Sequence, residues 1–319
     1  MSAFPEQTFA SGYKIPCVGL GTWKSKPGEV GAAVKSAIRI GYRHLDCALV
    51  YGNEKEIGQA IKECIDEGLV KREDLFITTK LWNTYHRAAR VAEGCQESLD
   101  NLGLDYIDLY LIHWPLPLRE NAGLFPLTED GLTDVIDIDF TETWTAMQDL
   151  VDQGLCRSIG VSNFNSKQIQ RLIDLGLKHP ISCNQVEISP YISNEKLLQF
   201  CKSKDITVVA YSPLGSADRP WAKPDDPVLL EEPAILKIAA RHKKSAGQVI
   251  LRWGVQRGYI VIPKSVSEAR QKQNFEIFDF TLDDEEMNVI HGMNRNFRVC
   301  VWNRAGAYHS PYYPFHEEF

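Results

Sequence analysis

The chain has 319 residues, of which 44% are hydrophobic and 24% are charged, the composition of an ordinary globular protein. Its formal net charge of −7 argues against a broad basic surface for nucleic acid or acidic lipid. The apolar runs are much shorter than the roughly 20 residues that a membrane-spanning helix needs. The first residues, MSAFPEQTFASGYKIP, lack the basic-then-apolar pattern of a secretory signal, so we expect a cytoplasmic protein.

The eight cysteines form no C-x-x-C pair, and several stand inside apolar runs, where cysteine acts as a small hydrophobe. We therefore expect reduced and mostly buried thiols. The eight histidines show no H-E-x-x-H or other paired spacing, so no metal site is expected.

Eight short β-rich runs recur along the chain, and helical patterns separate them. Residues 27–41, 54–68 and 142–154 place apolar residues three and four positions apart and end in glycine, which predicts helices. The runs are largely apolar on both faces, as in a parallel sheet covered by helices. They are residues 18–22, 44–48, 75–82, 107–114, 158–164, 181–189, 206–214 and 259–265.

Eight β-α units in 319 residues predict an α/β fold, a closed (β/α)8 TIM barrel, as one domain that spans residues 1–319. A doubly wound open sheet is the alternative. Residues 6–17 predict a β-hairpin turning at Ser11 and Gly12, at the bottom of the barrel. Long loops follow the fourth and seventh strands at 116–139 and 215–233, and the aromatic-rich tail from 294 to 319 has no regular period. Loops of this length are usually functional.

Polar side chains stand where the predicted strands end, which is where a (β/α)8 barrel carries its active site. Taken alone, Lys80 would be a surface lysine, His113 a core histidine, Tyr51 a loop residue and Asp46 a helix cap. Four titratable groups at three consecutive strand ends favour one shared site instead. The polar residues at these ends are Asp46, Tyr51, Thr79, Lys80, His113, Ser162, Asn163, Asn184, Gln185, Glu187, Tyr211, Ser212, Lys264 and Ser265.

The chemistry of this group suggests proton donation. A buried Asp46 needs a cation, and Lys80 on the next strand is available. An ammonium beside Tyr51 would lower the pKa of its phenol from about 10 and make it a general acid. His113 would orient the same substrate oxygen. Because no side-chain nucleophile is evident, we expect a hydride from a cofactor.

The cofactor site is not of the Rossmann type, because Lys24 of GLGTWK stands where the third glycine of G-x-G-x-x-G belongs. The segment IPKSVSEARQKQN, residues 262–274, is the stronger candidate. Lys264 and Arg270 flank a predicted helix start, which suits a phosphate monoester and favours NADPH over NADH, although a solvated basic helix face is the alternative. Tyr211 could stack on a nicotinamide, with Ser162, Asn163 and Gln185 binding its carboxamide.

GYRHLDCALVYGNEKEIG, NLGLDYIDLYLIHWP and IPKSVSEARQKQN resemble the three signature regions of the aldo-keto reductases, and the resemblance extends over the whole chain. It implies a (β/α)8 barrel, NADPH/NADP+ as cofactor, and a catalytic tetrad of Asp46, Tyr51, Lys80 and His113. It also implies a set of cofactor-binding residues, namely Thr22, Trp23, Asp46, Ser162, Asn163, Gln185, Tyr211, Ser212, Leu214, Ser216, Lys264, Ser265, Val266, Ser267, Arg270, Gln273 and Asn274.

Within that family the chain is most similar to the aldehyde reductase branch, which implies reduction of aromatic, medium-chain and carboxylated aldehydes such as glucuronate. The resemblance implies that Arg304 recognises carboxylated substrates, with Arg298 as the second candidate. The aromatic residues that would wall the substrate pocket, together with Tyr51 and His113, are Trp23, Trp82, Trp114 and Trp221. We expect loop 215–233 to fold over the cofactor as a clasp whose opening limits turnover.

Other functions remain open at this stage. An aldose or ketone reductase of the same family is one alternative, and a non-catalytic NADPH-binding module is another. A (β/α)8 lyase that uses Lys80 as a Schiff base is a third, although Asp46 should keep this lysine charged. Nothing in the sequence demands an oligomer, and the resemblance implies a monomer whose partners are small carbonyl compounds.

Overall fold

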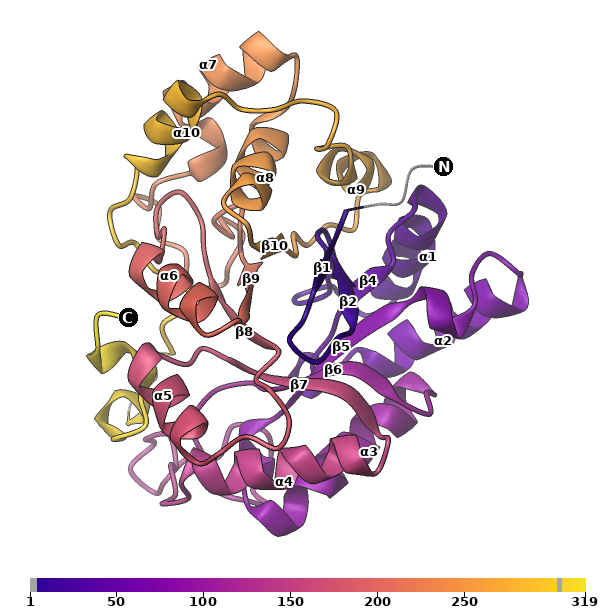
Figure 1. Ribbon diagram of the computed structural model, residues 1–319, viewed down its shortest axis with the longest axis vertical. Coiled ribbons are helices and arrows are strands. Elements are labelled where there is room, and N and C mark those ends of the chain that lie inside the picture. Colours follow the sequence, from indigo (N-terminus) through magenta and orange to yellow (C-terminus); the bar gives the residue numbers. More distant parts are fainter. Residues whose placement is uncertain (1–4, 303–305) are drawn as a thin grey trace.

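A parallel sheet of eight strands forms the centre of the computed structural model, which describes residues 5–302 and 306–319 (Figure 1). Each strand pairs with the next along the chain, so the sheet has no change of winding direction. In this order the strands are β3 (Leu20–Gly21), β4 (His44–Asp46), β5 (Phe76–Leu81), β6 (Ile107–Ile112), β7 (Cys156–Ser162), β8 (Cys183–Glu187), β9 (Thr207–Tyr211) and β10 (Ile260–Val261).

The sheet closes on itself between its first and last strands. The amide of Gly19 donates to the carbonyl of Val261 over 2.9 Å, and the amide of Gly21 donates to that of Pro263 over 3.1 Å. The amide of Val261 in turn donates to the carbonyl of Cys17 over 3.1 Å. The predicted barrel is therefore confirmed, and the open doubly wound sheet is excluded.

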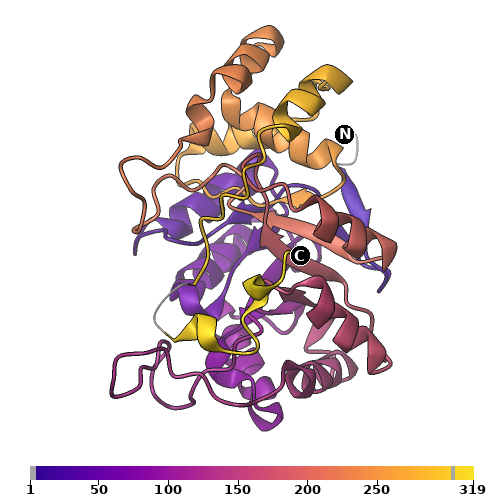
Figure 2. The same ribbon diagram turned by 90° about the vertical axis from the view of Figure 1, so that its left-hand side faces the viewer.

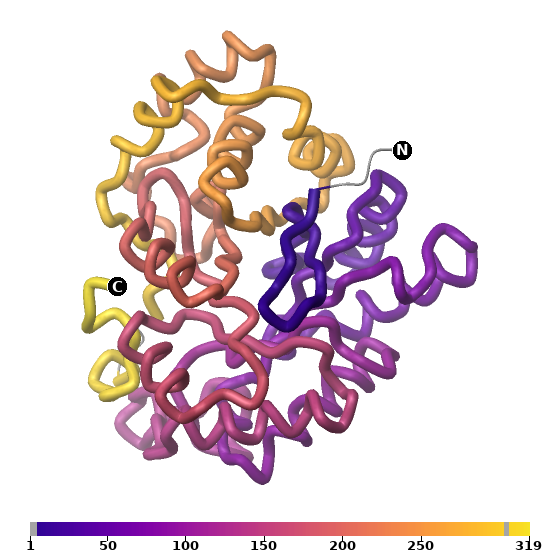
Figure 3. Tube along the Cα trace, viewed as in Figure 1, coloured from indigo at the N-terminus to yellow at the C-terminus, as the bar shows by residue number. Residues whose placement is uncertain are grey.

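Ten helices among the described residues surround the strands (Figures 1 and 3). In α1, Val30, Val34 and Ile38 recur at four-residue spacing and are buried, and the helix ends at Gly41, whose φ is 124°. The helices are α1 (Val30–Ile40), α2 (Glu54–Asp66), α3 (Ala88–Leu102), α4 (Phe140–Asp152), α5 (Ser166–Asp174), α6 (Glu195–Ser203), α7 (Pro233–His242), α8 (Ala246–Gln256), α9 (Glu268–Phe275) and α10 (Asp284–His291).

Two helices, α7 and α8, stand between β9 and β10, and α10 follows α9, so the described residues hold more helices than the eight of a regular (β/α)8 barrel.

The cysteines agree with the sequence analysis: all eight are free thiols, of which seven are buried and Cys300 is half-buried. Among the described residues, no helix combines the length and apolar character that crossing a membrane would require.

The predicted N-terminal hairpin is confirmed and closes the bottom of the barrel. Its strands β1 (Glu6–Thr8) and β2 (Lys14–Pro16) pair in antiparallel fashion around Gly12, whose φ of 88° suits a tight turn. Phe9 and Ile15 are buried among the apolar side chains of the barrel interior. This hairpin lies across the near end of the barrel in Figure 1.

The long segments beyond the opposite strand ends confirm the two predicted loops and the irregular tail. The loop after β6 reaches α4, and the loop after β9 contains one 3-10 turn, η4 (Leu229–Glu231). The tail contains two such turns, η5 (Ala307–His309) and η6 (Pro314–His316), and crosses the side of the molecule shown in Figure 2. The hydroxyl of Tyr312 donates to Asp137 over 3.0 Å, which ties the tail to the loop after β6.

Candidate active site

A cavity of about 1170 Å³ opens at the carboxyl ends of the strands. Most residues predicted for the site line it, namely Thr22, Trp23, Asp46, Tyr51, Trp82, His113, Trp114, Ser162, Asn163, Gln185, Tyr211, Ser212, Leu214, Ser216, Trp221, Lys264, Ser265, Val266, Arg270, Gln273 and Asn274. Lys80 lies behind this lining and is fully buried. Ser267 is not among the lining residues, and Arg304 lies outside the described residues.

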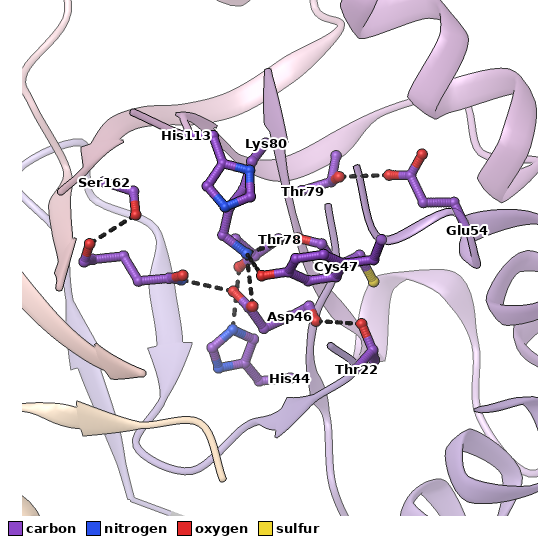
Figure 4. Close-up of polar contacts among 12 residues, drawn as sticks. Thr22, His44, Asp46, Cys47, Glu54, Thr78, Thr79, Lys80, His113 and Ser162 are labelled. Carbon is purple, nitrogen blue, oxygen red and sulfur yellow. Dashed lines mark hydrogen bonds and ion pairs between the residues drawn. The ribbon is translucent and has the colours of Figure 1, made fainter. Parts of the chain in front are cut away.

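Three of the predicted tetrad residues, Asp46, Tyr51 and Lys80, form one connected group. Figure 4 labels Asp46 and Lys80 at its centre. The ammonium of Lys80 donates to Asp46 Oδ1 over 2.7 Å and to the carbonyl of Cys47 over 2.8 Å, and it lies 3.4 Å from the hydroxyl of Tyr51. The second carboxylate oxygen of Asp46 accepts a hydrogen bond of 2.7 Å from Gln185. The predicted pairing of Asp46 with Lys80, and the position of Tyr51 beside them, are confirmed.

The protonation states follow from burial and from this pairing. Burial favours a neutral amine at Lys80, but Asp46 and Tyr51 outweigh it and raise the pKa of Lys80 to about 12. Burial also raises the pKa of Tyr51 to about 12, although Lys80 acts to lower it. The expectation of a lowered phenol pKa was therefore wrong for this structure, because removing the phenolate from water outweighs the single ammonium.

His113 faces Tyr51 and is neutral. Its ring centroid lies 5.9 Å from that of Tyr51 and 5.3 Å from that of Trp82, in edge-to-face contacts. Burial, with a smaller contribution from Lys80, lowers the pKa of His113 well below its usual value. A neutral imidazole keeps one N–H, so it can donate a hydrogen bond without bringing a second positive charge.

A hydrogen-bond chain continues from Asp46 and Gln185 around the barrel rim. Ser162 donates to the carbonyl of Gln185 over 2.8 Å, and Asn163 donates to Ser162 over 3.2 Å and to the carbonyl of His113 over 2.9 Å. The hydroxyl of Tyr211 donates to the amide oxygen of Asn163 over 2.7 Å. This chain fixes the polar side of the cavity.

The backbone is strained at several positions around this cavity. Ten non-glycine residues among those described have positive φ, and five of them line it. Such conformations persist where surrounding contacts enforce them, and they gather at functional sites. The five are Lys24, Asn163, Ser212, Ser216 and Trp302, with φ of 60°, 62°, 48°, 42° and 34°.

The cavity lining combines cations with a helix start, as predicted. Lys264 follows β10, and α9 begins at Glu268 after the N-cap Ser267, whose hydroxyl accepts from the amide of Arg270. Ser267 therefore caps the helix. The lysine, the arginine and the helix N-terminus together offer the positive charge and free N–H groups that an anion-binding site requires. The volume and this donor set fit a dinucleotide phosphate better than a single small substrate.

Part of the cavity has aromatic walls. The rings of Trp82 and Trp302 stack with centroids 5.4 Å apart, and Trp114 meets Trp302 edge-to-face at the same separation. Trp302 and Phe125 were missed in the sequence analysis, as were Val50, Cys300 and Val301. The only sequence signal was the aromatic richness of the tail, which has no period to place a residue. Arg298 packs over Phe315 at 3.9 Å and is not among the lining residues, which weakens its case as the second carboxylate-binding candidate.

The loop after β9 is joined to both sides of the cavity. Lys24, just beyond β3, pairs with Asp218 of this loop over 2.8 Å. Trp221 packs against Trp23 with centroids 5.8 Å apart and donates to the carbonyl of Val299 over 2.7 Å. Among the described residues, no group of three or more His, Cys, Asp or Glu side chains could hold a metal ion.

The chain belongs to the aldo/keto reductases, because the family model described as "Aldo/keto reductase family" matches residues 17–295.

The relatives confirm the predicted resemblance to the aldehyde reductase branch. The chain is 46% identical to aldo-keto reductase family 1 member A1-A of Danio rerio, with 98% of each chain covered. It is 49% identical to family 1 member A1 of Gallus gallus, over 91% of this chain and 89% of that one. Among solved structures, the aldose reductase of Schistosoma japonicum matches with a TM-score of 0.93 and 45% identity, over 99% of this chain and 100% of that one.

Proposed function

We propose that the protein reduces aldehydes to primary alcohols with NADPH, and that Tyr51 is the general acid. One observation supports this most directly. The ammonium of Lys80, held by Asp46, lies 3.4 Å from the Tyr51 hydroxyl, and Tyr51 lines the same cavity as Lys264 and Arg270.

NADPH would occupy this cavity. Arg270 and Lys264 would bind the phosphate that distinguishes NADPH from NADH. Ser162, Asn163 and Gln185 would hold the nicotinamide carboxamide. The remaining residues proposed to contact the cofactor are Thr22, Trp23, Asp46, Tyr211, Ser212, Leu214, Ser216, Ser265, Val266, Ser267, Gln273 and Asn274.

When bound, NADPH supplies a hydride to the carbonyl carbon. Tyr51 gives its hydroxyl proton to the carbonyl oxygen as negative charge develops there, a contribution typically worth ~10²–10⁴ in rate. Its high pKa keeps the proton on the phenol until then. Lys80 stabilises the phenolate that remains. Neutral His113 donates a hydrogen bond that orients the same oxygen.

The aromatic walls support a preference for aromatic and medium-chain aldehydes. Trp23, Trp82, Trp114 and Trp221 would pack against the apolar part of the substrate and exclude water. We propose that carboxylated aldehydes such as glucuronate are also reduced, with Arg304 as the carboxylate-binding residue.

The direct test mixes the purified protein with NADPH and follows the absorbance of the reduced cofactor after adding paired neutral and carboxylated aldehydes. Loss of absorbance with the neutral aldehydes is the expected result. Quenching of tryptophan fluorescence by NADPH, without turnover of any aldehyde, would contradict the proposal and favour a cofactor-binding module. Trapping of a substrate on Lys80 by borohydride would favour a lyase.

A further inference from the structure

Tyr51 stands in a turn that side-chain hydrogen bonds tie to Thr22, just beyond β3, and to Thr79 of β5. The turn follows β4, contains η1 (Leu49–Tyr51), and leads through Gly52 with φ of 68° directly into α2. The residues that link Tyr51 to this helix therefore decide where the phenol lies relative to Lys80.

Asn53 anchors the turn on one side. Its side chain is 8% exposed, and its amide nitrogen donates to the carbonyl of Thr22, beyond β3, over 3.0 Å. The hydroxyl of Thr22 donates to the carbonyl of Asp46 over 2.8 Å. Asn53 is therefore linked, through Thr22, to the backbone of Asp46 at the end of β4.

Glu54 anchors the turn on the other side (Figure 4). Its carboxylate is 2% exposed and accepts a 2.5 Å hydrogen bond from the hydroxyl of Thr79, the neighbour of Lys80 on β5. Successive residues of a strand point to opposite faces, so Lys80 enters the barrel while Thr79 faces α2. Asn101 of α3 donates to the second oxygen over 3.4 Å.

We propose that Glu54 is a positioning residue that, through Thr79, holds the Tyr51 turn at the distance from Lys80 that proton donation requires. This inference rests on the proposed function. The 3.4 Å between Lys80 and the Tyr51 hydroxyl is at the outer limit of a hydrogen bond, so a small displacement of the turn breaks the contact. Misplacement of a reacting group by ~1 Å can cost ~10²-fold in rate.

Glu54 also has a simpler role, because a carboxylate in the first turn of α2 stabilises that helix. Burial raises the pKa of Glu54 to about 7, and the hydroxyl of Thr79 opposes this increase. A purely structural role predicts a loss of thermal stability with kcat unchanged. A positioning role predicts a loss of kcat with NADPH affinity unchanged.

The experiment compares Glu54→Ala, Glu54→Gln and Thr79→Val in the full chain. Glu54→Ala should lower kcat at least tenfold and leave the Kd of NADPH within twofold. Glu54→Gln should keep at least half of kcat, because its amide oxygen still accepts from Thr79. Thr79→Val should lower kcat, and combining it with Glu54→Ala should add no further loss.

Glu286 supplies the matched control, because it is also a buried carboxylate in the first turn of an outer helix, where it pairs with His242 over 2.9 Å. Glu286→Ala should lower Tm without changing kcat. If Glu54→Ala keeps its kcat, or loses kcat and NADPH affinity together, the positioning role is wrong.

A second measurement does not depend on activity. Amide hydrogen exchange of residues 47–57 reports how often the turn opens. In this turn the amides of Tyr51 and Gly52 donate to the carbonyls of Ala48 and Leu49. Exchange should quicken in Glu54→Ala and Thr79→Val but not in Glu54→Gln. Unchanged exchange would overturn the inference. If the unaltered protein reduced no aldehyde, the proposed function would fail, and this exchange would still show whether Glu54 holds the turn.

Discussion

The ammonium of Lys80 lies 2.7 Å from the carboxylate of Asp46, and neither side chain is more than 3% exposed. An ion pair this deeply buried is costly to assemble, and removing one partner would leave the other charge buried and unpaired. Here the same ammonium reaches Tyr51, which connects the pair directly to the proposed chemistry.

Replacing Lys80 should expose the cost of that burial. Lys80→Met leaves Asp46 with Gln185 as a neutral partner and should destabilise the fold by about 3–5 kcal/mol. Chemical denaturation measures this loss. Lys62→Met is the control, because Lys62 pairs with Asp66 on the exposed face of α2, and it should cost less than about 0.5 kcal/mol. Equal losses in the two variants would contradict the importance of the buried pair.

Tyr51→Phe removes the hydroxyl that would donate the proton, and with it the contact to Lys80. We expect kcat to fall at least ~10²-fold, the typical contribution of general acid catalysis, while NADPH still binds. Steady-state kinetics and a fluorescence titration with NADPH measure the two quantities separately. Tyr42→Phe is the control, because this buried hydroxyl donates to the Gln271 carbonyl away from the tetrad. Ordinary activity in Tyr51→Phe would show that another group donates the proton.

The strand-end residues could be predicted because the order of strands in a barrel fixes which ends meet. Once three consecutive strands were recognised, the positions of Asp46, Lys80 and His113 at neighbouring strand ends followed. The phenol pKa could not be predicted, because the sequence gives the neighbouring ammonium but not the depth of burial that outweighs it. The sign of the shift therefore came out opposite to the expectation.

The tail shows a second limit of the sequence. The buried carboxylate of Glu187, at the end of β8, accepts from the amides of Val299 and Cys300 over 2.8 Å each. These bonds bring Trp302 to the cavity. A segment without helical or strand periodicity offers no pattern from which such a long-range anchor could be inferred.

Arg270→Met should weaken NADPH far more than NADH. Removing a charged hydrogen bond typically costs about 1.5–3 kcal/mol, which is roughly 10–100-fold in Kd. Fluorescence titration with both cofactors measures the change in their ratio. Lys272→Met on the same helix is the control, since Lys272 lies near Glu276 and does not line the cavity. An equal loss for both cofactors would argue against phosphate recognition by Arg270.

Buried histidines should destabilise the protein in acid. Burial lowers the pKa of His86 to about 3 and that of His44 to about 4. Below pH ~6.5 these two histidines bind protons in the unfolded chain but not in the folded chain. Their contribution to the free energy of unfolding is therefore fully present above this pH and is lost as the pH falls. The slope is at most about 1.4 kcal/mol per pH unit for each histidine.

Denaturation between pH 7 and 5 tests this, with His86→Leu showing a shallower loss than the unaltered protein. His309→Gln, which changes an exposed histidine, should keep the original slope. An unchanged slope in His86→Leu would show that His86 takes up its proton in the folded state as well.

Asp218→Asn should speed cofactor release. The Lys24–Asp218 pair joins the loop after β9 to the residues beyond β3, and both residues line the cavity. We therefore expect this loop to separate from Lys24 before a bound cofactor leaves. Asp218 is 68% exposed, and such pairs contribute at most about 1 kcal/mol, so release should quicken no more than roughly fivefold. Stopped-flow fluorescence measures the release rate, and kcat should rise by the same factor if loop opening limits turnover.

The control for Asp218→Asn is Glu67→Gln, which breaks the exposed Arg39–Glu67 pair on the outer helices and should change neither the release rate nor kcat. Hydride transfer slower than release in the unaltered protein would show that chemistry, and not this loop, limits turnover.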